Sequence, residues 1–443
     1  MNKSVSFHEA LRKKHLATLW TCFINMFLGG WLLTGHAVFG YKSDEMIYSD
    51  CISGIIAMLF SFFSLSYRRT WAPWMVCLVG VWLQFAPLIF WAPDPSAYVN
   101  DTLIGVFLIL FSLLIPGVPG KLSTTGPEIP PGWSYNPSSW LQRIPIIFLG
   151  SLGWFIARYL AAYQLGYIDT MWDPFFGEGT IHVITSNISK AFPIPDAGLG
   201  ALAYTFEALM GCKGDTRRWY TMPWIVVGFG ILVVPLGLVS IILIILQPLV
   251  VGSFCTLCLC TALAMLIMIS LTVDEVVAVL QYLSRVRKSK RSFWKIFFQG
   301  GAEPLARYDE RTPLFTDKSS KIFSSMTWGI TIPWNLLFTA VLGGLLIAAP
   351  SLFKITGKLA DLDPILGALI VTASIIAMAE VIRSVRYVNL LFAISILLSS
   401  LVFGEKTLPV LFFHIIVSGL LLILTFRKGR ILEKYGAWQR FIH

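Results

Sequence analysis

Long apolar runs, separated by charged or Gly/Pro-rich breaks, follow one another along almost the whole chain. A helix that crosses a lipid bilayer needs roughly 20 mostly apolar residues, and the runs are close to that length. The pattern predicts about twelve transmembrane helices, at residues 17–38, 51–67, 71–92, 99–117, 143–165, 197–212, 221–246, 250–272, 331–350, 364–382, 387–403 and 408–426. A polar loop, 166–196, and a basic stretch after residue 272 interrupt the series.

The composition points to the same class of protein. Hydrophobic residues make up 56% of the chain and charged residues 13%, and the mean hydropathy is +0.73. A soluble domain carries about 25% charged residues. We therefore expect an all-α polytopic membrane protein.

The lysines and arginines gather in alternate connections between the predicted helices. If the N-terminus is cytoplasmic, few of the 34 basic residues lie toward the opposite side, namely Lys42, Arg158, Lys190, Lys354, Lys358 and Lys406. This asymmetry predicts that both termini are cytoplasmic, and the first run lacks an evident cleavage site for a signal peptide. The net charge of +10 then indicates contact with anionic lipid and not with nucleic acid. The basic and aromatic segment 285–298 fits an interfacial helix on such lipid.

A weak repeat relates the beginning and the end of the chain. In both parts an aspartate stands four residues before the second of two glycines, and a double-basic turn follows. The residues are Gly30, Asp50 and Gly54 in the first part, and Gly344, Asp363 and Gly367 in the last. Paired glycines permit close helix contact. The repeat predicts two related four-helix units that flank a central four-helix bundle.

The first of these units resembles the SPW-repeat membrane modules of bacteria. The resemblance rests on Trp31, on the residues "SD" and "SG" within 49–54, and on "PW" at 73–74. The last unit has lost the tryptophans. We expect an SPW-like module at 1–120, a central core at 121–275, a basic linker at 276–328 and a C-terminal four-helix module at 329–443.

Candidate chemistry lies in the segment "SFCTLCLC", residues 253–260, which holds three of the seven cysteines. On a helix Cys255 and Cys258 share a face, at a separation that suits a disulfide, whereas Cys260 points elsewhere. The predicted helix starts near Val250, so the pair lies in its first two turns, where the helix dipole favours a thiolate. The spacing and the location suit thiol exchange.

Two other interpretations of these cysteines stay open. Free cysteine is often a small buried apolar residue, which is how we interpret Cys22, Cys51, Cys77 and Cys212. Metal binding is the less favoured alternative, because only His182 offers a further soft ligand on the same side. We expect no metal.

The central core resembles the vitamin K epoxide reductase family of the bacterial type, which couples quinone redox chemistry to protein thiols. The resemblance covers Phe148 to about Ile269. It rests on Ser186 in "VITSNIS", on the spacing of Asp196, Gly200 and Tyr204 in "FPIPDAGLGALAYTFEALMG", and on "GSFCTLC". It implies a quinone substrate and a bacterial inner membrane.

The family's residue roles carry over to six positions. They imply that Cys258 faces the quinone and that Cys255 exchanges with other thiols. Asp196 stands where an asparagine commonly hydrogen-bonds a quinone carbonyl, so it would have to be protonated to donate. Tyr204, with Gly200 and Ser186, would complete the quinone site and help to protonate the ring oxygen.

The chain departs from the family in the loop after the first core helix. Family members usually carry two cysteines there, which pass electrons to the C-x-x-C pair. Here the loop has no cysteine, and Trp172 or Asp173 and Thr180 stand near those positions. An external dithiol protein of the thioredoxin type would then have to reach Cys255 directly, or the activity is lost.

Three further polar residues are accessory candidates. Glu207 is an intramembrane carboxyl group, which either acts in function or bonds a neighbouring helix. Arg158 could pair with a quinone carbonyl or with Glu207, or extend to the interface. His182 could transfer protons.

The leading hypothesis is a membrane thiol:quinone oxidoreductase with its C-x-x-C pair at the extracytoplasmic membrane surface. The alternative is a non-catalytic membrane scaffold or small-molecule carrier that keeps the core fold, which the missing loop cysteines favour. A transporter is the third possibility, because the flanking units repeat, although few buried charges mark a path.

Overall fold

The computed structural model describes residues 3–116, 126–289, 291–403 and 408–442. Within them, 11 helices are long and apolar enough to cross a membrane. The expected all-α polytopic membrane protein is confirmed. A further helix, α7 (Asp196–Cys212), has 17 residues and corresponds to the remaining predicted span.

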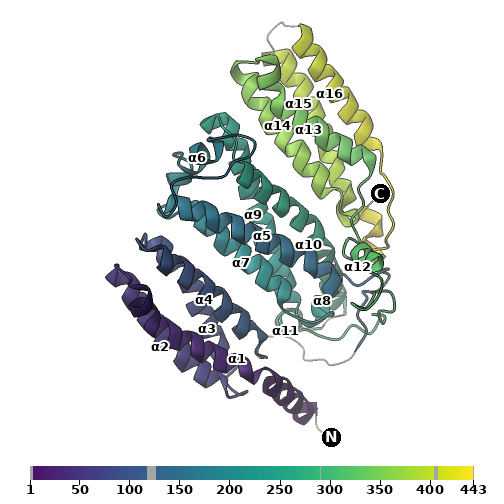
Figure 1. Ribbon diagram of the computed structural model, residues 1–443. Helices are drawn as coiled ribbons and strands as arrows, with labels where there is room; N and C mark the ends of the chain where they lie inside the picture. The colour runs from purple at the N-terminus through teal and green to yellow at the C-terminus, as the bar shows by residue number, and fades with distance from the viewer. Residues whose placement is uncertain (1–2, 117–125, 290, 404–407, 443) are drawn as a thin grey trace.

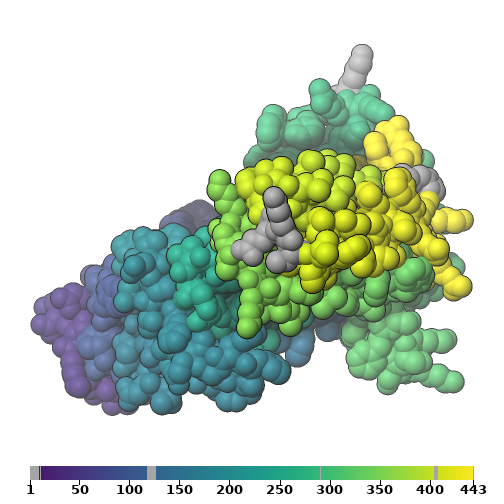
Figure 2. All heavy atoms as spheres, turned by 90° about the horizontal axis from the view of Figure 1, so that it is seen from above, coloured from purple at the N-terminus to yellow at the C-terminus, as the bar shows by residue number. Residues whose placement is uncertain are grey.

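The helices form three units that stand in a row (Figure 1). The N-terminal unit consists of α1 (Lys3–Phe39), α2 (Asp44–Ser64), α3 (Ala72–Ile89) and α4 (Pro95–Leu114). The central bundle consists of α5 (Trp140–Gln164), α7, α9 (Pro223–Leu246) and α10 (Thr256–Lys288). The C-terminal unit consists of α13 (Trp334–Phe353), α14 (Gly357–Ile376), α15 (Val388–Phe403) and α16 (Leu408–Phe426). Viewed from above, the first and last units lie at opposite ends of the molecule (Figure 2).

Helix α7 joins the central bundle to the N-terminal unit, because α3 and α4 pack against it. On the other side of the bundle, α14 packs against α9 and α10. The core of the bundle is a cluster of apolar side chains that includes Trp154, Phe229 and Met268. The three units therefore bury apolar faces against each other, while many apolar side chains on their outer surfaces remain exposed, as lipid contact requires.

Short helices cover the two ends of the bundle. One end, which we call the α6 end, carries α6 (Gly179–Ile184), the 3₁₀ turn η1 (Ser189–Ala191) and the π turn η2 (Gln247–Val251). The opposite end, the α12 end, carries α8 (Arg218–Thr221), α11 (Phe293–Gln299), α12 (Ser319–Ser325), η3 (Glu380–Tyr387) and η4 (Gly436–Phe441).

Glycine contacts hold the helix pairs of the flanking units, but one member of each predicted pair is wrong. An added Cβ at Gly29 would meet the backbone oxygen of Gly54, and one at Gly343 would meet that of Gly367. The predicted Gly30 and Gly344 face open space. Both members of each GG dipeptide look alike in the sequence, and only the helix rotation decides which one packs.

Helix α10 runs 16 residues past the predicted end at residue 272. The extension is polar, yet Asp274, Glu275 and Gln281 are buried. Each has a protein partner: Tyr135 donates to Asp274, the Arg218 guanidinium pairs with Glu275 at 2.5 Å, and Gln281 donates to the Tyr435 carbonyl at 3.0 Å. The hydropathy pattern predicts an end at residue 272 because the residues that follow are polar. It does not show that distant residues bind these polar side chains inside the protein.

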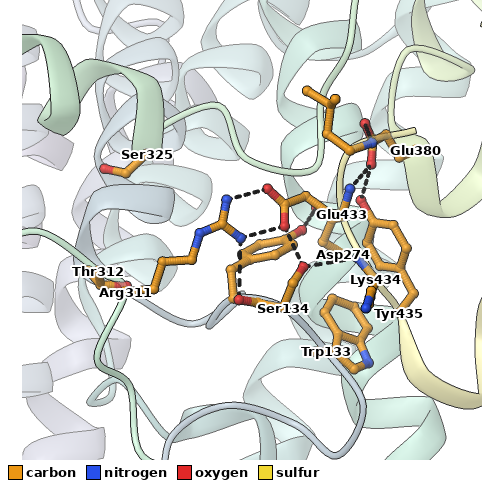
Figure 3. Close-up of polar contacts among 12 residues, drawn as sticks. Trp133, Ser134, Asp274, Arg311, Thr312, Ser325, Glu380, Glu433, Lys434 and Tyr435 are labelled. Carbon is orange, nitrogen blue, oxygen red and sulfur yellow. Dashed lines mark hydrogen bonds and ion pairs between the residues drawn. The ribbon is translucent and has the colours of Figure 1, made fainter. Parts of the chain in front are cut away.

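The C-terminal segment is fastened at the α12 end by two buried carboxylates (Figure 3). The Glu433 carboxylate accepts two hydrogen bonds from Arg311, at 2.5 and 2.6 Å, and a third from Ser134. Glu380 accepts from the Glu433 amide at 3.0 Å and from the Tyr435 hydroxyl at 3.1 Å. The hydrogen bond to Glu433 raises the pKa of the Arg311 guanidinium, although burial opposes it, so the guanidinium stays protonated.

Replacing Arg311 by alanine is expected to destabilise this end of the molecule. The substitution leaves the Glu433 side chain, which is only 5% exposed, without its cation, at a cost of about 2 kcal/mol. The check is the melting temperature of the detergent-solubilised protein, which should fall by several degrees. Arg430→Ala, at an exposed position of the same segment, is the control. Equal melting temperatures for the two variants would contradict this role of Arg311.

Candidate redox site

Cys255 and Cys258 form a disulfide at the α6 end, with their Cα atoms 5.2 Å apart. Cys255 is buried, Cys258 is half-buried, and Cys260 is exposed and unpaired. The other four cysteines, Cys22, Cys51, Cys77 and Cys212, are free thiols. The pairing expected from the spacing is therefore present in the structure.

The backbone around the disulfide differs from the continuous helix expected from residue 250. Chain direction changes at Gly252, whose φ of +71° is a left-handed conformation that favours glycine. Cys255 is the N-cap of α10, and its Sγ accepts the Cys258 amide at 3.0 Å. The capping position satisfies an amide at the helix start, and it places the two sulfurs in different surroundings.

Gln247 fixes the backbone of Cys255 and was not expected from the sequence. Its Oε1 atom accepts the Cys255 amide at 3.0 Å, and its side chain is only 3% exposed. The signal in the sequence is a single amide at the end of the long apolar run of α9. Polar groups at such positions are candidates for a structural or functional partner.

Asp173 fastens the loop between α5 and α6 over the disulfide. Its carboxylate accepts hydrogen bonds from the amides of Phe175, Phe176 and Thr180, at 3.2, 2.9 and 3.0 Å. The Thr180 hydroxyl donates at 2.6 Å, and the hydroxyl of Thr256, next to Cys255, donates as well. Asp173 and Thr180 thus bond to each other near the positions where family members carry loop cysteines.

The electrostatics of Asp173 follow from this set of donors. Partial burial would raise the pKa of the carboxyl group, but the hydrogen bonds from Thr180, Thr256 and the two Phe amides outweigh it and hold the pKa well below its usual range. Asp173 is therefore ionised at neutral pH. Trp172, Phe175 and Phe176 in the same loop are exposed.

A cavity of about 160 Å³ lies beside the disulfide, between α5, α7, α9 and α10. Cys258 lines the cavity and Cys255 does not; Cys255 belongs to a buried cluster to which Met171 of the loop after α5 also packs. The cavity brings together all of the residues predicted to bind quinone: Ser186, Asp196, Gly200 and Tyr204. Gln247, Ser189 and Thr261 add polar groups, and the remaining wall is mainly apolar.

Asp196 lies in the cavity wall as expected, and one of its two carboxyl oxygens is held by three hydrogen-bond donors. Its Oδ1 atom accepts from Gln164 Nε2 at 2.6 Å, from Ser189 Oγ at 2.7 Å and from the Ala197 amide at 2.8 Å. Asp196 is also the first residue of α7, where the helix dipole favours a negative charge. All three donors act on the same oxygen, and the sequence alone did not reveal Gln164 or Ser189.

Tyr204 and the other cavity residues have partners of their own. The Tyr204 hydroxyl donates to the Thr261 carbonyl at 3.1 Å, so it holds α7 to α10 and leaves its oxygen lone pairs for a ligand. Ser186 donates to the Val183 carbonyl at 2.7 Å. Gly200 leaves room in the wall, because an added Cβ would touch only Ala157 at 3.8 Å.

The three accessory candidates lie outside the cavity wall. Glu207 is fully buried, and neither of its oxygens has a hydrogen-bond partner among the described residues. Arg158 does not pair with it; the guanidinium lies over the rings of Trp154 at 4.5 Å and Tyr98 at 5.6 Å. His182 is exposed and contacts Ser253 at 3.3 Å.

Comparison with known proteins agrees with this geometry. Residues 144–273 match the model of the vitamin K epoxide reductase family, and residues 19–115 match the SPW repeat domain. No curated protein and no solved structure matches the chain. The match to the first family model spans α5 to the middle of α10 and includes the disulfide and the cavity. A segment similar to the vitamin K epoxide reductase family therefore follows a segment similar to the SPW repeat domain.

Proposed function

We propose that the protein is a membrane thiol:quinone oxidoreductase whose redox pair is Cys255 and Cys258. The family domain supports quinone chemistry coupled to thiols at the level of the family. The observation that carries the proposal is the position of the disulfide: Cys258 lines a cavity between membrane helices, and Cys255 lies on the side of the covering loop. One sulfur can thus meet a quinone and the other a protein thiol.

The reaction balances within the site. Reduced Cys255 and Cys258 together give up two electrons and two protons, the S–S bond forms, and the quinone becomes a hydroquinone. An extracytoplasmic dithiol protein of the thioredoxin type would then reduce the disulfide by attack at a sulfur. In this proposal the α6 end is extracytoplasmic, the termini are cytoplasmic, and the membrane is a bacterial inner membrane.

The cavity residues position the quinone ring in this proposal. The Gln247 and Gln164 side chains anchor the backbone of Cys255 and the Asp196 carboxylate. The Tyr204 ring forms part of the wall, and its anchored hydroxyl keeps the wall rigid. Rigid placement of the reacting atoms is a large part of such catalysis.

The experiment is a thiol-trapping assay on the purified, reduced protein. Thiols are alkylated before and after a short-chain quinone is added, and the modified residues are mapped by mass spectrometry. Labelling of Cys255 and Cys258 should be lost only after quinone is added, while Cys260 stays labelled. Unchanged labelling of the pair would reject the proposal.

One observation favours the alternative of a non-catalytic membrane scaffold. Cys255 is 0% exposed, and the Asp173 loop holds no cysteine that could carry electrons to it. A scaffold that kept the disulfide for stability would show the same features. It would leave the trapping pattern unchanged by quinone.

Substitution of Asp196 tests the cavity as the quinone site. Asp196→Asn keeps an oxygen for the donors on Gln164 and Ser189 and adds an amide donor for a quinone carbonyl. One added hydrogen bond is worth about 1 kcal/mol, so kcat/KM for quinone should rise roughly fivefold to tenfold. Steady-state kinetics measures this, with Asp196→Ala as the matched variant that should lose activity. Equal kcat/KM in both variants would place the quinone elsewhere.

A further inference from the structure

The flanking units are built from four helix pairs with one shared layout. In three pairs a glycine of the first helix packs on the backbone of a glycine in the second. The glycine pairs are Gly29 with Gly54, Gly80 with Gly105, and Gly343 with Gly367. In the fourth pair, α15 and α16, Ser418 donates to the Ala393 carbonyl at 2.8 Å at the corresponding place. Each unit is therefore itself a duplication.

One ionisable residue occupies the same position in every pair. It stands six residues after the first residue of the second helix and four residues before the small packing residue. These residues are Asp50, Asp101, Asp363 and His414, and all four are 0% exposed. At a rise of about 1.5 Å per residue they lie about 9 Å inside the helix ends.

The two helix pairs of the N-terminal unit meet reciprocally around Asp50 and Asp101. Trp31 Nε1 donates to Asn100, the residue before Asp101, at 2.9 Å. Trp82 Nε1 donates to Ser49, the residue before Asp50, also at 2.9 Å. Such an exchange is expected of an approximate twofold axis, and it brings the two aspartate carboxyl groups close enough to interact electrostatically.

In the C-terminal unit the corresponding two residues hold a proton. His414 Nε2 lies 3.0 and 3.1 Å from the two oxygens of Asp363. His414 Nδ1 lies 2.8 Å from the Val410 carbonyl, which can only accept, so Nδ1 carries a hydrogen. The contact between Nε2 and the carboxyl group then needs one further proton, and the buried pair is neutral overall.

In the N-terminal unit an aspartate stands where the C-terminal unit has this histidine, so the pair itself contains no side chain that can carry a positive charge. None of the four carboxyl oxygens of Asp50 and Asp101 has a hydrogen-bond donor among the described residues. The groups near enough to influence the two carboxyls electrostatically are each other, the Tyr41 hydroxyl and the Asn100 amide, and that amide donates to the Tyr41 oxygen at 3.0 Å. The titratable neighbours that pack nearby are Tyr41, Tyr167 and His36, of which His36 contacts Cys51 at 3.8 Å. No lysine or arginine in the described part of the chain acts on either aspartate.

Two carboxyl groups in contact inside a membrane cannot both be ionised, because the uncompensated charge is too costly to bury. We propose that Asp50 and Asp101 form a proton-binding site, in which one proton is shared on the axis of the N-terminal unit. It occupies the position that the histidine proton occupies in the C-terminal unit. Shared protons between paired aspartates are an established arrangement in proteins.

A proton suits the site better than a metal ion. The site offers only two carboxyl groups, and a metal ion would need several more oxygen ligands. No group of three or more His, Cys, Asp or Glu that could hold a metal occurs in the described part of the chain. The proton is taken up from the end at which α2 and α4 begin. This proton-binding site is independent of the proposed redox chemistry at Cys255 and Cys258.

Infrared spectroscopy of the full-length protein tests the site. A protonated carboxyl group has a C=O stretch that shifts in D₂O. Wild-type protein should show this band at pH 7, where an ordinary aspartate with a pKa of about 3.9 is ionised. The double variant Asp50→Asn/Asp101→Asn should lose the band. Other buried carboxyls, such as Glu207 and Asp274, contribute equally to both proteins and cancel in the difference spectrum.

Three further variants keep the test decisive. Asp44→Asn removes an exposed carboxyl group at the start of α2 and should leave the band unchanged. Asp101→His copies the Asp363 and His414 pair, so it should fold and also lose the band. His414→Asp should add a second band. Equal bands in wild type, the double variant and Asp101→His would overturn the proposal, and so would a wild-type band that appears only when sodium is replaced by choline.

Discussion

The Cys258→Ser protein is expected to lose quinone-dependent thiol oxidation almost entirely. Cys258 is the sulfur that lines the cavity, and a serine hydroxyl can neither form a disulfide nor pass on electrons. Loss of a residue that forms the covalent intermediate costs roughly 10³-fold or more. The measurement is the initial rate of quinone reduction by the reduced protein.

Two further cysteine variants show whether the loss is specific to the redox pair. Cys260→Ser removes the exposed thiol two residues away and should react at the wild-type rate. Cys255→Ser should be as inactive as Cys258→Ser, because the disulfide needs both sulfurs. A Cys258→Ser protein that reduces quinone at the wild-type rate would place the chemistry elsewhere.

The Asp173→Ala protein is expected to expose Cys255 to thiol reagents. The substitution removes the five hydrogen bonds that the Asp173 carboxylate accepts from the loop and from Thr256. Hydrogen bonds to a charged group contribute about 1.5–3 kcal/mol, so local opening should become roughly 10- to 100-fold more frequent. The rate of maleimide alkylation of Cys255 in the reduced protein should rise by that factor.

Asp169, which is exposed in the same loop, provides the control, and Asp169→Ala should alkylate at the wild-type rate. If Asp173→Ala alkylates no faster than Asp169→Ala, the loop does not guard Cys255. In the proposed enzyme this loop must open before a partner thiol can react. A faster exchange with an external dithiol in Asp173→Ala would therefore accompany the faster alkylation.

The loop attachment should not change with pH in the physiological range. The pKa of Asp173 is lower in the folded protein than in the unfolded chain, so its contribution is complete above the unfolded value of about 3.9. It is lost only as the pH falls through the lower, folded value. Between pH 5 and 8 the alkylation rate, corrected for the fraction of thiolate, should stay constant.

Hydropathy was sufficient to predict the helices, because membrane-spanning segments must satisfy their own backbone and expose apolar side chains to lipid. The cavity residues could also be predicted, because the spacing of Asp196, Gly200 and Tyr204 and the C-x-x-C resemble those of a family with this core. These signals are local in the sequence.

Features that depend on helix rotation and on distant partners could not be predicted. The sequence did not distinguish Gly29 from Gly30 as the packing residue, or indicate that Gln247 would meet the Cys255 amide. Nor did it indicate that Gln164 and Ser189 would donate hydrogen bonds to the Asp196 carboxyl group. The polar end of α10 was missed because its carboxylates are compensated by residues more than 50 positions away.

The most direct test of the redox account is the stoichiometry of a single turnover. Fully reduced protein is mixed with excess short-chain quinone without oxygen, and the hydroquinone formed is measured by absorbance. We expect one hydroquinone for each wild-type protein molecule, with the Cys255–Cys258 disulfide recovered in the same amount. The Cys258→Ser protein should yield no hydroquinone. Hydroquinone in equal yield from both proteins, or none from wild type, would contradict the redox account.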